Sequence, residues 1–215
     1  MKISLVSMVR FLAPGILVVA LLPAATAQPM TPDALVRGTT TDIIGVLKKE
    51  KDAFTKDPKR IYELVDAKVL PHFNFTRMTQ LAVGKHWNSA SPTQRDALTK
   101  EFRTLLVRTY SSALELYKDQ SIDVRALVAP AADNEVTVKT QINHPGGQPI
   151  PMDYRMERTA SGWKVFDVTV EGVSIVTTYR SQFNTEVGRT GVDGLIKSLS
   201  EKNARLDAQS RTAQK

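Results

Sequence analysis

Apolar side chains recur every three or four residues through the first half of the chain, which is the spacing of amphipathic helices. Thr31-Pro32 and Asp57-Pro58 each combine a capping side chain with a proline that the first helical turn tolerates, so helices are predicted to begin there. A shorter helix is predicted over Asn74–Val83, with Gly84 in a left-handed cap. The inward positions of the first two helices are Leu35, Thr39, Ile43, Val46, Leu47, Ile61, Leu64, Val65 and Val69.

The clearest helical pattern follows Ser91-Pro92-Thr93-Gln94, in which serine and glutamine can cap each other's backbone N–H groups. Apolar residues then step by three and four, while charged residues occupy the opposite face. The sequence therefore predicts one long amphipathic helix with a wide apolar stripe. The residues of the stripe are Leu98, Phe102, Leu105, Leu106, Tyr110, Ala113 and Tyr117.

After residue 120 the hydrophobic period changes to two, which is typical of strands with one buried face. Four strands separated by short turn-forming clusters predict an antiparallel meander. Their apolar positions are Ile122, Val124 and Ala126; Val136, Val138, Thr140 and Ile142; Ile150, Met152, Tyr154 and Met156; and Trp163, Val165, Phe166 and Val168. A last helix is predicted from near Gly191, with Leu195, Ile196 and Leu199 inward, followed by a polar tail over residues 208–215.

These elements predict an α+β fold. The N-terminal helices and the long amphipathic helix would cover one face of an antiparallel meander of four or more strands, with a C-terminal helix after it. Such layers either close over a packed core or stand apart and leave a cavity. The pattern alone does not decide between the two, and a packed core is the commoner outcome.

Residues 1–27 have the pattern of a secretory signal peptide. Lys2 and Arg10 flank the basic region, Phe11–Leu22 is almost wholly apolar, and Ala25-Thr26-Ala27 predicts cleavage after Ala27. The apolar run is shorter than the roughly 20 residues of a membrane-spanning helix. We therefore expect an exported protein with a single domain over residues 28–207.

Composition excludes several classes of protein. The chain has no cysteine, which rules out disulfide scaffolds, thiolate metal sites, cysteine nucleophiles and a lipid anchor on cysteine. Residues 1–27 hold two basic and no acidic side chains, so the other 188 residues carry a net charge of +5. This charge is spread along the chain, which does not suggest a nucleic-acid partner.

Candidate catalytic groups are few. His72, His86 and His144 lie in no metal-binding motif, and no Gly-x-Ser-x-Gly sequence is present. Asp167 and Glu171 are two carboxylates near the end of the last strand, and a buried acid beside Tyr154 would suit proton abstraction in an isomerase or hydrolase. The simpler interpretation places Asp167 on the solvated face and has Glu171 cap the following turn.

Four blocks of sequence, in order, resemble one family. Val69-Leu70-Pro71-His72-Phe73-Asn74-Phe75 leads into Met78 and Trp87, and Ser91–Arg95 leads into Thr109-Tyr110. Val170–Ser174 with Tyr179–Phe183 forms the third block, and Gly191–Leu195 the last. Together they resemble MlaC, the periplasmic phospholipid carriers also known as the toluene-tolerance family.

The resemblance implies a carrier without catalytic residues or cofactor, whose cargo is a phospholipid held in an apolar cavity. Its implied partners are an outer-membrane lipoprotein complex and the lipid-binding ring of an inner-membrane ABC transporter, and we expect a monomer. The residues expected to line the cavity are Val69, Phe73, Met78, Phe102, Leu106, Tyr110, Val138, Ile150, Met152, Tyr154, Val168, Val173, Ile175 and Val176.

Other residues have different expected places. Trp87 and Trp163 are expected in the core or at the rim, and Arg180 near the mouth, where it meets a phosphate or forms a surface ion pair. The segment from Glu171 to Gly191 is expected to move. Besides the enzyme, a solid-core adaptor that bridges envelope proteins remains an alternative.

Overall fold

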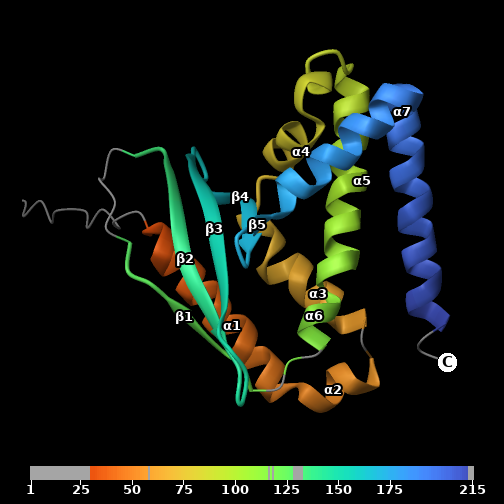
Figure 1. Ribbon diagram of the computed structural model, residues 1–215. Helices are drawn as coiled ribbons and strands as arrows, with labels where there is room; N and C mark the ends of the chain where they lie inside the picture. Colours follow the sequence, from red (N-terminus) through yellow and green to blue (C-terminus); the bar gives the residue numbers. More distant parts are fainter. Residues whose placement is uncertain (1–29, 58, 116, 118, 128–132, 213–215) are drawn as a thin grey trace, which may run out of the picture.

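The computed structural model describes residues 30–57, 59–115, 117, 119–127 and 133–212 (Figure 1). The expected signal peptide and its cleavage site after Ala27 lie outside these residues. The described chain forms an α+β fold, as predicted.

Helices make up the first half of the fold, and their ends follow the predicted caps. The Thr31 hydroxyl accepts a hydrogen bond from the Ala34 N–H (3.4 Å), and Ser91 and Gln94 form the reciprocal capping box. Gly84 adopts φ 62°, as its predicted cap position requires. The elements are α1 (Pro32–Lys49), α2 (Lys51–Lys56), α3 (Lys59–Lys68), the 3₁₀ helix η1 (Leu70–His72), α4 (Phe75–Val83), the 3₁₀ helix η2 (Gly84–Trp87), α5 (Pro92–Tyr110) and α6 (Ser112–Glu115). The long helix thus ends at Tyr110, before the predicted Tyr117.

The strands form an antiparallel meander in the order β1-β2-β3-β4-β5, as predicted. They are β1 (Ser121–Val124), β2 (Glu135–Asn143), β3 (Ile150–Thr159), β4 (Gly162–Val170) and the short β5 (Val173–Ser174). Tyr154 lies opposite Val138 and Val168, which confirms the predicted inward face. Figure 1 shows α1 along the sheet and α5 farther from it, whereas the last helix begins beside β5 and then leads away from the sheet.

A β-bulge in β4 corrects one expectation. Arg155 lies opposite Asp167 but Met156 lies opposite Val165, so Phe166 is an extra residue in β4. Phe166 packs with α4 and the last helix, and Asp167 is only 2% exposed, not solvated as expected. The bulge interrupts the alternation of the strand, because the consecutive side chains of Phe166 and Asp167 both lie on the opposite face of the sheet from Tyr154. Glu171 lies exposed in the β4–β5 turn with φ 50°.

The last helix, α7 (Ile175–Thr212), starts well before the predicted Gly191. Gly191, with a φ of 74° that favours glycine, is a kink between two helical parts of α7. The predicted last helix therefore does begin there, and a further helix from Ile175 precedes it. The predicted mobile segment is therefore mostly helix, and it buries Val176, Tyr179 and Phe183 in the core. The helix also continues through residues 208–212 of the expected polar tail.

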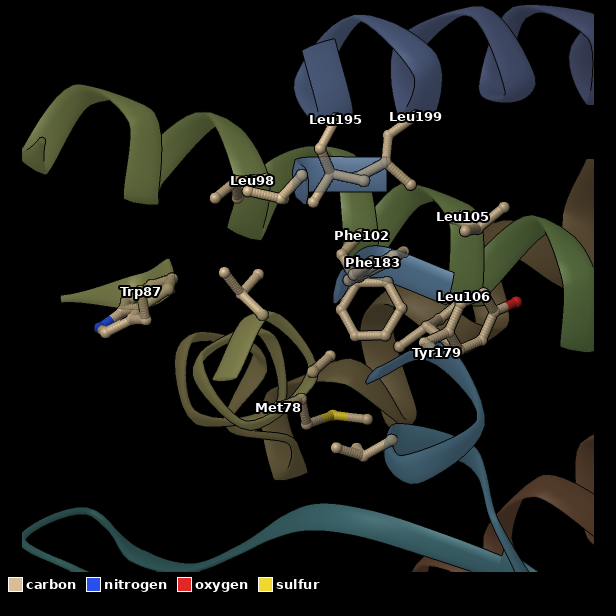
Figure 2. Packing of buried hydrophobic residues seen from close by; sticks show 14 of the residues in the cluster. Met78, Trp87, Leu98, Phe102, Leu105, Leu106, Tyr179, Phe183, Leu195 and Leu199 are labelled. Atoms are coloured by element: carbon tan, nitrogen blue, oxygen red, sulfur yellow. The ribbon is translucent and has the colours of Figure 1, made fainter. Parts of the chain in front are cut away.

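The largest apolar core joins α4, α5 and α7. Figure 2 shows Phe102 beside Tyr179 and Phe183, with ring centroids 5.0 and 5.1 Å from that of Phe102. A second cluster lies between the sheet and α1, and a third joins α1, α2 and α3. Trp87 and Trp163 are buried in the first and second clusters, as expected.

Candidate functional site

A cavity of about 460 Å³ lies where the sheet, α1, α3 and the end of α5 meet. Four strands and most of the helices contribute to its wall. Its lining is apolar or neutral, and no charged side chain belongs to it among the residues that the structure describes. The layers therefore stand apart here, which the sequence pattern alone left open.

Strand alternation builds one wall of the cavity. Met152 and Tyr154 project from β3 to the same side, and their partners in β4, Val170 and Val168, extend this wall. The sheet residues that line the cavity lie in the half of the sheet nearest the β2–β3 turn. Beyond Tyr154, Met156 is fully buried in the cluster under α1.

Helical spacing builds the opposite walls. Thr40, Ile43, Ile44 and Leu47 follow the i, i+3, i+4, i+7 pattern, so one face of α1 borders the cavity. The last turn and a half of α5 also borders the cavity, through Leu106, Val107 and Tyr110.

Nine of the residues predicted from the sequence line the cavity. They are Val69, Phe73, Met78, Leu106, Tyr110, Met152, Tyr154, Val168 and Ile175. The structure brings them together from five elements and the segments between them, although they are spread over more than a hundred residues of sequence. Their part in binding a ligand stays a prediction.

The other five predicted residues lie elsewhere. Phe102 and Val176 are in the core between α5 and α7, and Val138 is fully buried beneath α1. Ile150 is the first residue of β3, and Val173 is 61% exposed on β5. The hydrophobic pattern selected inward or apolar residues, but it did not show which inward residues face a neighbouring side chain and which face open space.

Sixteen further residues line the cavity and were not predicted. They are Thr40, Ile43, Ile44, Leu47, Val65, Leu70, Phe75, Val107, Ser111, Ala113, Leu114, Tyr117, Gln120, Ile122, Ile142 and Val170. The adjacent Ile43 and Ile44 widen the apolar face of α1 beyond a single stripe, and this was the available signal. A helix that borders both a core and a cavity needs such a wide face.

The polar groups in the lining are neutral. Burial raises the pKa of Tyr154 to about 12, so its phenol stays protonated over the physiological range. The Tyr154 hydroxyl donates to the sulfur of Met152 (3.0 Å), a weak acceptor. The Tyr117 hydroxyl is buried, and the described residues offer it no hydrogen-bond partner. These groups suit a ligand part that is mainly hydrocarbon.

The acids considered for catalysis do not meet Tyr154. The Asp167 carboxylate accepts hydrogen bonds from the Ser174 hydroxyl (2.7 Å) and the Val176 N–H (3.2 Å). It lies opposite Arg155, on the other face of the sheet from Tyr154. Asp167 therefore anchors the start of α7, and the arrangement proposed for an isomerase or hydrolase does not form.

Three further features concern Arg180, metal binding and membrane-spanning helices. Arg180 does not line the cavity; its guanidinium lies against Gly84, where a Cβ would come 3.2 Å from Nε. In the described ranges, no three His, Asp or Glu side chains come together as a metal site would need. None of the helices within those ranges has the length and hydropathy to cross a bilayer.

Comparisons with known proteins agree on one family. A family model described as MlaC protein matches residues 37–201. The toluene tolerance protein ttg2D of Pseudomonas putida is 30% identical over 189 residues, covering 86% of this chain and 87% of the relative. The intermembrane phospholipid transport system binding protein MlaC of Haemophilus influenzae is 23% identical over 174 residues, covering 80% and 81%.

A solved structure shares the fold. The phospholipid-binding protein from Ralstonia solanacearum, in complex with a phospholipid, superposes with a TM-score of 0.75 at 35% identity. The match covers 81% of this chain and 98% of the other. The family resemblance seen in the sequence is thereby confirmed.

Proposed function

Because the chain belongs to the MlaC family, we propose that it is a phospholipid carrier that holds acyl chains in the apolar cavity. The observation that carries this proposal is the lining, which encloses about 460 Å³ with apolar and neutral side chains. The phospholipid in the Ralstonia solanacearum structure supports it, since the two chains share this fold.

The physical need for such a cavity follows from the hydrophobic effect. Each methylene group that leaves a bilayer for water costs about 0.8 kcal/mol, so two chains of roughly fourteen methylenes cost on the order of 20 kcal/mol. Apolar walls replace the bilayer and remove most of this cost. Met78 and Met152 are flexible and polarizable, so they suit chains that lie in different conformations. The charged head group stays in water, because the lining offers it no counter-charge.

In the cell, the carrier would exchange phospholipid between an outer-membrane lipoprotein complex and the lipid-binding ring of an inner-membrane ABC transporter. This role would maintain the lipid asymmetry of the outer membrane. The lipid is cargo and not a cofactor, and no catalytic residue is needed. The name of the Haemophilus influenzae relative supports a part in intermembrane transport. Export with cleavage after Ala27 and a monomeric state complete the proposal.

Mass spectrometry of organic extracts tests binding directly. The protein comprising residues 28–215 is purified without detergent, beside Met152→Asp and the control Thr137→Asp. Met152 lines the cavity, whereas Thr137 is exposed in the same sheet. We expect near-stoichiometric phospholipid in the wild type and the control, and a large loss in Met152→Asp, because a carboxylate in the apolar cavity opposes hydrocarbon. A folded wild type without lipid contradicts the proposal.

A further inference from the structure

Tyr110 lies at the rim of the cavity. Its side chain belongs to the lining and yet is 45% exposed, so it touches both the apolar space and water. Tyr110 is the last residue of α5 and is close to the start of α7, where Ile175 also lines the cavity. A phenol at such a boundary resembles the tyrosines at the surface of a bilayer, which keep the ring in apolar surroundings and the hydroxyl in polar ones.

A second phenol, that of Tyr179, lies against the Tyr110 side chain. Tyr179 lies one helical turn after Ile175, and Figure 2 shows its hydroxyl directed away from Phe102 and Phe183. Burial raises the pKa of Tyr179, and the adjacent Tyr110 raises it further through electrostatic repulsion and hydrogen bonding, whereas a hydrogen bond with Thr109 lowers it. Tyr179 is thus within hydrogen-bonding reach of both Thr109 and Tyr110, and it leaves the Tyr110 proton free when it donates to Tyr110. The proton of Tyr110 is then available at the rim.

We infer that Tyr110 is a specificity-determining residue, which donates a hydrogen bond to an ester carbonyl oxygen of the bound lipid, with Tyr179 as its positioning residue. The inference rests on the proposed function and names the part of the lipid that this site recognises. The ester is the first polar group next to the acyl chain, so it lies at the boundary between cavity and water. Tyr154 does not meet this requirement, because its hydroxyl donates to the sulfur of Met152 inside the cavity.

Competition between ester and ether lipids tests this contact. Each protein variant is incubated with vesicles that contain equal amounts of dipalmitoyl phosphatidylcholine and its dihexadecyl ether analogue, which lacks both carbonyl groups. The protein is then re-isolated, and mass spectrometry gives the ratio of the two bound lipids. The variants are Tyr110→Phe, Tyr179→Phe and the control Tyr62→Phe, since Tyr62 does not line the cavity.

One hydrogen bond corresponds to a preference of about three- to tenfold. We expect Tyr110→Phe to lower the ester-to-ether ratio by about this factor relative to wild type. Tyr179→Phe should lower it less, and Tyr62→Phe should leave it unchanged. Any difference in how readily the two lipids leave the vesicle affects all variants equally, because all of them are incubated with the same mixture. It therefore cancels when the ratios of the variants are compared. Thermal melts of each variant report any loss of folded protein.

The outcomes separate the two proposals. An unchanged ratio in a folded Tyr110→Phe that still acquires lipid overturns the inference and leaves the carrier function standing. An equal fall in Tyr62→Phe also overturns it, because the effect is then not specific to the rim. If folded wild type acquires neither lipid, the proposed function itself fails.

Discussion

The two halves of α5 carry one continuous apolar stripe but meet different surroundings. In the first half, which we define as extending to Phe102, Leu98 and Phe102 are fully buried and pack in the cluster shared with α4 and α7. In the second half, Leu106 and Tyr110 border the cavity. Leu106 borders the cavity and is also a buried member of the cluster shared with α4 and α7.

The difference comes from what lies opposite the helix. Side chains of α7 such as Tyr179 and Phe183 fill the space beside the first half. The second half faces α1 and the sheet, which do not close upon it. An amphipathic stripe therefore fixes the direction in which a helix points, while the partner surface decides whether the result is a core or a cavity.

The largest effect is expected from Phe102→Ala. The change removes a ring that packs edge-to-face on Tyr179 and Phe183, so the free energy of unfolding should fall by about 3–5 kcal/mol. Denaturant melts measure the loss. Because Phe102 does not line the cavity, the lipid content of the folded fraction should stay near that of wild type. A selective loss of lipid with little loss of stability would remove the distinction between the two halves.

A matched pair of leucines sharpens the comparison. Leu98→Ala creates a new cavity in a filled core and should lower the free energy of unfolding by about 2–5 kcal/mol. Leu106→Ala should cost roughly half as much in lipid-free protein, because its side chain already borders open space and loses fewer contacts. Lipid occupancy should fall only in Leu106→Ala. Equal losses of stability and equal lipid occupancy in Leu98→Ala and Leu106→Ala would argue against a packed core at one leucine and a cavity at the other.

The phenol of Tyr154, which lines the apolar cavity, should make the protein sensitive to alkali. Its pKa is raised to about 12 in the folded state from about 10 in the unfolded state, so its contribution is fully present below pH 10. As the pH rises from about 10 to 12, the unfolded chain releases this proton first, and stability falls by about 2–3 kcal/mol. Tyr154→Phe removes this part of the pH dependence. Denaturant melts over this range measure it, with Tyr62→Phe as the control.

The smallest effect is expected from Asp167→Asn. The carboxylate caps α7 through the Val176 N–H and accepts from Ser174, and the amide keeps an acceptor but loses the negative charge near the start of the helix. Stability should fall by about 1 kcal/mol. Lipid content should be retained, because Asp167 faces away from the cavity. Loss of lipid in a stable Asp167→Asn would revive the enzyme alternative.

The sheet was largely predictable because alternation and register are local. Once one face is apolar, positions such as Met152 and Tyr154 must share that face, and the observed pairing agrees. The bulge at Phe166 was not predictable in this way. Two adjacent apolar residues, Val165 and Phe166, break the alternation at this point of the sequence, but such a pair does not by itself specify a bulge.

The first part of α7 and the extent of the cavity were harder to predict. The run of four β-branched residues from Ile175 to Thr178 disfavours a helix, although Val176, Tyr179, Phe183 and Val187 have helical spacing. Tertiary packing against α5 overrides the propensity. Whether Phe102 or Leu106 borders open space depends on surfaces distant in sequence, and no local pattern contains that information.

Anomalous diffraction from a bound phospholipid with brominated acyl chains tests the central claim most directly. The account predicts bromine peaks inside the cavity, between β3 and the second half of α5, near Met152 and Leu106. Bromine confined to the protein surface, or located in a space opened between α5 and α7, would contradict it.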